Sequence, residues 1–112
     1  MRREATGKLL RIFVDEKDRY GGQPAYVAVV DALRKAGFGG ASVLKGIEGY
    51  GLSGSVRTAR VFDLSTSLPI LIEAVEEEAK ILEFLPVLRE IVAEGLVTIE
   101  NLRLFSLSQD QP

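Results

Sequence analysis

Two kinds of hydrophobic periodicity alternate along this chain, in an order that few folds accommodate. Apolar residues alternate in residues 7–16, which predicts a strand, and three further segments, 41–48, the strongly β-branched 67–75, and 96–105, are also predicted to be strands. Residues 24–36 and 76–95 show helical spacing instead. The resulting order, βαββαβ, predicts an α+β, ferredoxin-like domain with a four-stranded antiparallel sheet and two helices on one face.

Start and stop signals support both helices. Pro24 is suited to the start of the first helix, and Gly37 is suited to a left-handed cap at its end. The second helix starts with three glutamates and is expected to reach Gly95, with a kink or a lost first turn at Pro86. The apolar stripes predicted to face the sheet are Tyr26, Val29, Val30, Leu33 and Ala36 in the first helix and Ile81, Leu85, Leu88 and Val92 in the second.

The first strand is apolar on both faces. Leu10, Ile12 and Val14 form one face, while Leu9 and Phe13 flank Arg11 on the other. Because the two helices can cover only one face, we expect Leu9, Phe13 and part of the last strand to meet other copies of the chain. The alternative is a monomer with a few exposed apolar side chains, which is common in proteins.

Composition limits the function classes. The 112 residues form one domain, with a core at about 8–105 and a frayed tail at 106–112, and the net charge of −2 argues against nucleic acid as a partner. Without His or Cys, the usual zinc, copper and iron ligands and the common Ser/His and Cys/His nucleophile arrangements are missing. Carboxylates and Lys remain possible catalysts, but no pair of carboxylates stands out from the solvated background. We therefore expect no catalytic residues, no metal site and no enzyme activity. The charged N-terminus lacks a signal-peptide core, so we expect a cytoplasmic location with no membrane insertion.

A glycine-rich stretch, KGIEGYGLSGS at residues 45–55, follows the second predicted strand. Gly49 and Gly51 could present backbone N–H groups to an anion, or could simply form a turn. Arg57 and Arg60 suit phosphate binding, or could be solvated charges or ion pairs between subunits.

Other candidates lie at the edges of the sheet and at the second helix. Lys45 and Arg103 either point into the same cleft or only edge the sheet. Residues 76–78 are all glutamates, and we interpret them as stabilising the helix N-terminus rather than as a divalent-ion site. The connection at residues 52–65 has few apolar anchors, so we expect it to be mobile without a ligand.

The sequence resembles the PII-like family known as domain of unknown function 190, over residues 8–105. The resemblance is carried by PAYVAVVDALRKAGFGGASVLKGIEGYG and VRTARVFDLSTSLPILIEAVE, above all by the glycines around Tyr50, by Arg57 and Thr58, and by LSTSLP at residues 64–69. The family is similar to the PII signalling proteins and CutA, which are trimers with sheets facing the three-fold axis. Two features depart from these patterns. Only AEGLV precedes the last strand, where PII proteins have a glycine-rich phosphate loop, and Arg57 stands where the family pattern has His.

The resemblance implies a non-enzymatic, nucleotide-binding signalling protein. It would be a homotrimer that binds ADP, ATP or AMP, or a similar anion, in clefts between subunits and controls a partner through the loop at residues 50–66. Together with the residue chemistry above, the candidate ligand-binding residues are Lys45, Gly49, Tyr50, Gly51, Arg57, Thr58, Arg60 and Arg103. The alternative is a ligand-free protein-interaction module. Its partner could be a membrane transporter or channel, because genes of this family often resemble neighbours of the genes for small fluoride-exporting membrane channels. A carboxylate and arginine enzyme is the weakest alternative.

Overall fold

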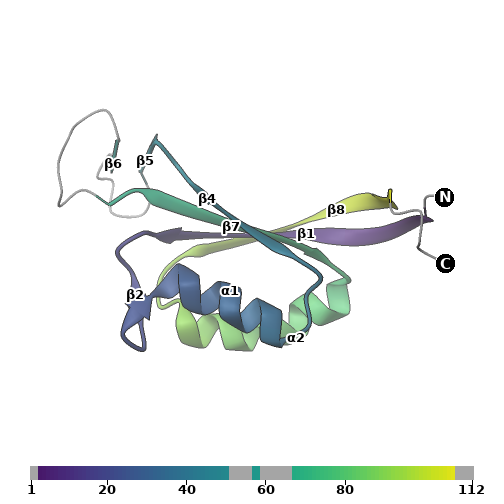
Figure 1. Cartoon of the computed structure of the whole chain (residues 1–112), viewed down its shortest axis with the longest axis horizontal. Coiled ribbons are helices and arrows are strands. Elements are labelled where there is room, and N and C mark those ends of the chain that lie inside the picture. Colours follow the sequence, from purple (N-terminus) through teal and green to yellow (C-terminus); the bar gives the residue numbers. More distant parts are fainter. Residues whose placement is uncertain (1–2, 51–56, 59–66, 108–112) are drawn as a thin grey trace.

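The computed structural model describes residues 3–50, 57–58 and 67–107 of the chain, and the side chains of residues 6–50 and 67–107. Its main sheet contains β1 (Arg3–Asp15), β4 (Ala41–Lys45), β7 (Pro69–Glu76) and β8 (Leu96–Ser106), all paired antiparallel in the order β4-β7-β1-β8. The helices α1 (Ala25–Lys35) and α2 (Glu78–Ile91) lie side by side on one face of this sheet (Figure 1). The predicted α+β, βαββαβ fold is confirmed.

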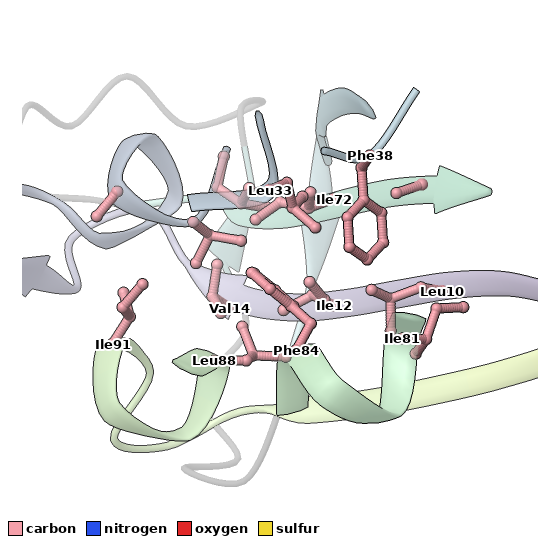
Figure 2. Packing of buried hydrophobic residues seen from close by; sticks show 14 residues of the cluster. Leu10, Ile12, Val14, Leu33, Phe38, Ile72, Ile81, Phe84, Leu88 and Ile91 are labelled. Atoms are coloured by element: carbon pink, nitrogen blue, oxygen red, sulfur yellow. The ribbon is translucent and has the colours of Figure 1, made fainter. Parts of the chain in front are cut away.

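The core fills the space between this helix layer and the sheet. Leu10, Ile12 and Val14 of β1 point towards the helices and are buried, as the alternation of strand 1 predicts (Figure 2). Phe38, just after α1, packs against Phe84 of α2 with ring centroids 5.3 Å apart and a 59° angle between planes. This tilted arrangement is favourable for aromatic pairs and joins the chain after α1 to the second helix.

Helix α1 begins and ends where the sequence predicts. Pro24 is its N-cap, and Gly37 adopts φ +87°, the left-handed conformation that favours glycine. The N–H of Phe38 donates to the carbonyl of Leu33 at 3.1 Å, and the N–H of Gly37 donates to that of Arg34 at 3.1 Å. These two bonds satisfy carbonyls that would otherwise be unpaired at the end of the helix.

Helix α2 differs from the prediction in three respects. It runs unbroken through Pro86, and it ends at Ile91 rather than near Gly95. In its fully buried stripe, Phe84 and Ile91 take the places predicted for the residues that directly follow them. The buried residues are Ile81, Phe84, Leu88 and Ile91, while the predicted Leu85 and Val92 are only partly buried beside them.

The early end of α2 follows from the way the chain enters β8. Leu96 pairs with Phe13, so β8 begins alongside the far end of β1. A Cβ on Gly95 would lie 2.8 Å from the carbonyl oxygen of Phe13, so the backbone passes too close to β1 for a larger residue. The chain must therefore leave the helix by Val92, whose backbone is extended.

Two short strand pairs were not predicted. The polar segment after strand 1 forms a small hairpin, β2 (Arg19–Tyr20) with β3 (Gln23–Pro24), and two glycines with positive φ, Gly21 and Gly22, make its turn. Past Lys45, β5 (Glu48–Gly49) pairs with β6 (Arg57–Thr58). The predicted second strand at 41–48 is thus divided between β4 and β5.

The strands β1 and β8 extend beyond the rest of the sheet. Lys8 pairs with Glu76 at the end of β7, whereas the earlier residues of β1, Arg3 to Gly7, pair only with β8. The resulting two-stranded arm reaches away from the helices (Figure 1). No helix of the described residues is long and apolar enough to cross a membrane.

Candidate functional site

The base of the connection between β4 and β7 is the most precisely built part of the predicted site. The N–H of Gly46 donates to the carbonyl of Pro69 at 2.8 Å, which joins the two ends of this connection directly. A Cβ on Gly46 would lie 2.8 Å from Cγ of Pro69, so the Gly46 backbone packs directly against the Pro69 ring. Glycine at position 46 therefore has a packing reason in addition to its place in a glycine-rich stretch.

Lys45 lies at this base, and its ammonium group is paired. Its Nζ is 2.6 Å from Oε2 of Glu16, which follows the last residue of β1. The other carboxylate oxygen, Oε1, accepts a hydrogen bond from the N–H of Leu68 at 3.0 Å, and the N–H of Glu16 donates to the carbonyl of Leu68 at 3.1 Å. Glu16 therefore contacts both ends of the connection, Lys45 before it and Leu68 after it.

Both charges of this pair are stabilised. The hydrogen bond from Lys45 is the largest cause that lowers the pKa of Glu16, and the bond from the Leu68 N–H adds to it. The same hydrogen bond, with the attraction of the carboxylate, raises the pKa of Lys45. At neutral pH both groups are ionised, and Lys45 is a fixed cation whose side chain is still 53% exposed.

The pairing of β5 with β6 brings together the backbones of some of the other predicted residues in this region. Gly49 pairs with Arg57, and Glu48 pairs with Thr58, so the predicted glycine and arginine lie opposite each other on adjacent strands. Tyr50 follows directly and is 75% exposed. Gly51, Arg60 and most of the connection predicted to be mobile lie outside the described residues, as do the side chains of Arg57 and Thr58.

Arg103 lies far from Lys45 within one chain. Arg103 pairs with Thr6 near the start of β1, whereas Lys45 pairs with Ile70, which pairs with Val14 near the end of β1. Eight residues of strand separate these two positions, or about 26 Å at 3.3 Å per residue. The alternative in which the two residues only edge the sheet therefore fits a single chain.

Arg103 instead belongs to the two-stranded arm and borders a hollow. Its guanidinium carbon lies 5.2 Å from the ring centroid of Phe105, within the range of cation–π contacts. The hollow is lined by β1 and β8 residues and by Glu77 and Glu78 at the start of α2. Within it, Lys8 donates a hydrogen bond to Asn101 and lies 3.3 Å from Glu78.

The glutamates at the start of α2 have local structural partners. Glu76 accepts hydrogen bonds from the N–H groups of Gly39 at 3.4 Å and Glu77 at 3.3 Å, and it lies 3.7 Å from Nζ of Lys80. In the described part of the chain, no three acidic side chains are grouped so that they could hold a metal ion.

The sheet face opposite the helices carries a charged cluster that the sequence analysis did not identify. Nε of Arg11 donates to Oε2 of Glu73 at 2.8 Å, and its Nη1 donates to Oε1 of Glu100 at 3.3 Å. The bond to Glu73 is the main cause that raises the pKa of Arg11. The alternation of strand 1 places Arg11 on this face, but its partners depend on the pairing of β7 and β8 with β1.

Apolar side chains surround this cluster, and we call the whole surface the open face. Phe13 pairs with Leu71 of β7 and with Leu96 of β8, and Leu71 pairs in turn with Leu44 of β4. Leu96 is 60% exposed, Leu44 48% and Phe13 39%. The prediction that Phe13 and part of the last strand lie on the face without helices is confirmed.

The architecture is that of a PII-like protein. The structure is similar to CPII, a nitrogen regulatory PII-like protein from Thiomonas intermedia K12 bound to ADP, AMP and bicarbonate, with a TM-score of 0.62, 20% identity and coverage of 91% of each chain. It is also similar to a protein of Thermus thermophilus, TTHA0516, described as a putative PII-like signaling protein, with a TM-score of 0.62, 19% identity and coverage of 92% of this chain and 91% of that one. At this identity the two likenesses establish the fold.

The sequence itself gives the family. Residues 7–104 match the model of DUF190, described as "Uncharacterized ACR, COG1993", and the chain belongs to this family. The chain is 36% identical to a UPF0166 protein of Aquifex aeolicus over 100 residues, which cover 89% of this chain and 94% of the relative. It is 37% identical to the UPF0166 protein MJ1524 of Methanocaldococcus jannaschii over 99 residues, 88% of this chain and 91% of the relative.

Proposed function

We propose that this protein is a non-enzymatic, cytoplasmic PII-like regulator that assembles as a homotrimer. In this proposal it binds an adenine nucleotide, or a similar anion, in the clefts between subunits. The bound ligand changes how the connection at residues 50–66 presents itself to a partner protein. The fold likeness to CPII, a protein whose structure was determined with ADP and AMP, supports the choice of an adenine nucleotide.

The open face is the observation that carries the assembly. Within the described residues both helices cover the opposite face, so Phe13, Leu44 and Leu96 keep much of their surface exposed. Apolar area removed from water contributes about 25 cal/mol per Å². Sheets that face one another around a three-fold axis would bury this surface, as PII-like assembly implies.

The positions of the predicted ligand residues support a site between subunits. Lys45 and Arg103 lie at opposite ends of the sheet, about 26 Å apart along the strands, so one chain cannot place both on a small ligand. In a closed ring of copies, one end of each subunit can approach the other end of its neighbour. A shared cleft would then combine Lys45 of one copy with Arg103 of the next.

Thermal melts with and without ADP, combined with native mass spectrometry, test the proposal. Ligand at 100 times its dissociation constant should add about 2.7 kcal/mol of stability if it binds only the folded protein. The double substitution Arg57→Ala, Arg60→Ala should abolish this increase without lowering the melting temperature in the absence of ADP. As a matched control, Arg34→Ala and Arg89→Ala, which remove two arginines from the exposed surfaces of the helices, should leave the increase intact.

A second candidate is a protein-interaction module that needs no small ligand. Ile47 is 76% exposed and Tyr50 75%, both at the start of the connection. Large apolar side chains grouped at such a position are typical of protein contacts, and a membrane transporter or channel is the proposed partner. A trimer without bound nucleotide, and with no change in melting temperature on adding ADP, ATP or AMP, would favour this second function.

A further inference from the structure

Glu16 occupies a position that the proposed ligand would also need. Its Oε2 lies 2.6 Å from Nζ of Lys45, the cation at the base of the β4–β7 connection. A carboxylate and a phosphate oxygen make the same kind of charge-assisted contact with an ammonium group. The chain therefore already contains an anion at this lysine.

The contact is strong in geometry but not sealed from solvent. The Lys45 side chain is 53% exposed and that of Glu16 is 28% exposed, so an anion from solution can reach the ammonium group. Exposed ion pairs contribute little net stability, because water and salt screen them and both side chains lose freedom. A phosphate group, with more than one negative charge near neutral pH, can replace a single carboxylate at such a site.

Glu16 would remain attached to the sheet after this replacement. Its Oε1 accepts the N–H of Leu68 at 3.0 Å, and its own N–H donates to the carbonyl of Leu68 at 3.1 Å. These bonds join the end of β1 to the start of β7 and do not involve Lys45. Only the link from Lys45 at the end of β4 would be lost.

We propose that Glu16 is an internal competitor for the anion that binds Lys45, so that ligand binding exchanges the Glu16 carboxylate for a ligand phosphate. The exchange releases the end of β4 from the end of β1. Ligand binding thereby changes the contacts of β4, the strand from which the connection begins. This inference rests on the proposed function in one respect, that Lys45 belongs to the anion site. Because coupling between the two interactions is reciprocal, whatever strengthens the Lys45–Glu16 pair lowers the affinity for the ligand.

The substitution Glu16→Gln tests this competition. Glutamine keeps an oxygen that can accept the Leu68 N–H but loses the charge that holds Lys45. Calorimetry with ADP should show affinity about 1.4- to 5-fold higher than in the wild type, the range that an exposed ion pair supports. The matched control is Asp31→Asn, which breaks the exposed Asp31–Lys35 pair, 3.1 Å long, on α1 and should leave the affinity unchanged.

A double-mutant cycle separates competition from a general effect on folding. Lys45→Met should weaken ADP binding, and Glu16→Gln should then have no further effect in the Lys45→Met background. Glu16→Asp, whose shorter side chain reaches less far towards Lys45, should also raise the affinity and serves if Glu16→Gln does not fold. Lower ADP affinity in both Glu16 variants would overturn the inference. So would an equal gain in ADP affinity from Glu16→Gln in the Lys45→Met background.

A nucleotide-free titration decides the inference if the wild type binds no adenine nucleotide, in which case the proposed function fails separately. Inorganic pyrophosphate is added while the NMR signal of the Lys45 side chain is followed. Glu16→Gln should respond at a lower pyrophosphate concentration than the wild type. An equal response, or no response in either protein, would show that Glu16 does not compete for Lys45.

Discussion

Replacing Phe13 with aspartate probes the open face most directly. Phe13 lies between Leu71 and Leu96 in the register of the sheet, at the centre of the apolar surface that the helices leave uncovered. In a single subunit the residue is 39% exposed, so the substitution changes a partly solvated position. In the proposed trimer the same position lies within the contact between copies.

The size of the effect follows from the exposed fraction. Full burial of a Phe side chain contributes about 1.5–3 kcal/mol, so the 39% left exposed can contribute roughly 0.6–1.2 kcal/mol on assembly. Three copies give about 2–3.5 kcal/mol, and each aspartate enclosed in the contact adds a desolvation penalty of several kcal/mol. The sum should weaken assembly by at least about a thousandfold, since 1.4 kcal/mol corresponds to a factor of ten.

Sedimentation equilibrium at micromolar concentration measures this directly, with thermal melts on the same samples. The matched control is Val27→Asp: Val27 is 40% exposed, but it lies on α1, in the helix layer. Phe13→Asp should give monomers or unfolded chains, while Val27→Asp should remain trimeric. A monomeric wild type would refute the reasoning, and so would a trimeric Phe13→Asp variant with an unchanged melting temperature.

Three further outcomes test the fold and the candidate site. Gly37→Ala should lower stability by about 1–2 kcal/mol in denaturant titrations, because φ +87° is strained for alanine. The matched control is Gly39→Ala, which should not lower stability, because Gly39 lies outside the positive-φ region and has open space around it. Gly95→Ala should cost about 1–3 kcal/mol, because the new Cβ would lie 2.8 Å from the β1 backbone, and melting at the wild-type temperature would contradict this contact. Lys45 lowers the pKa of Glu16, so the stabilisation from this carboxylate is present above its unfolded pKa, about 4.3, and is lost as pH falls through the lower folded value. The stability difference between wild type and Glu16→Gln should therefore shrink below about pH 4, and a difference independent of pH from about 7 to about 3 would contradict the ion pair.

Local sequence signals determined the main strands and helices of this protein and their order. The alternation in strand 1 separated Leu10 and Ile12, which are buried, from Phe13, which lies on the open face. Pro24 and Gly37 set the ends of α1, because each acts through its own backbone conformation. Such signals need no knowledge of distant residues, and the βαββαβ order then left the ferredoxin-like fold as the simplest arrangement.

Tertiary structure decided the features that depend on contacts between distant segments. The stripe of α2 shifted to Phe84 and Ile91, and the helix ended before Gly95, because the sheet and the entry into β8 set its rotation and its length. Glycine spacing pointed to the base of the connection but not to Glu16, whose partner Lys45 lies 29 positions further along the chain. The same is true of Arg11, which meets its carboxylates only through the pairing of three strands. A periodic pattern fixes which way a side chain points, whereas the packing of the whole chain fixes what that side chain meets.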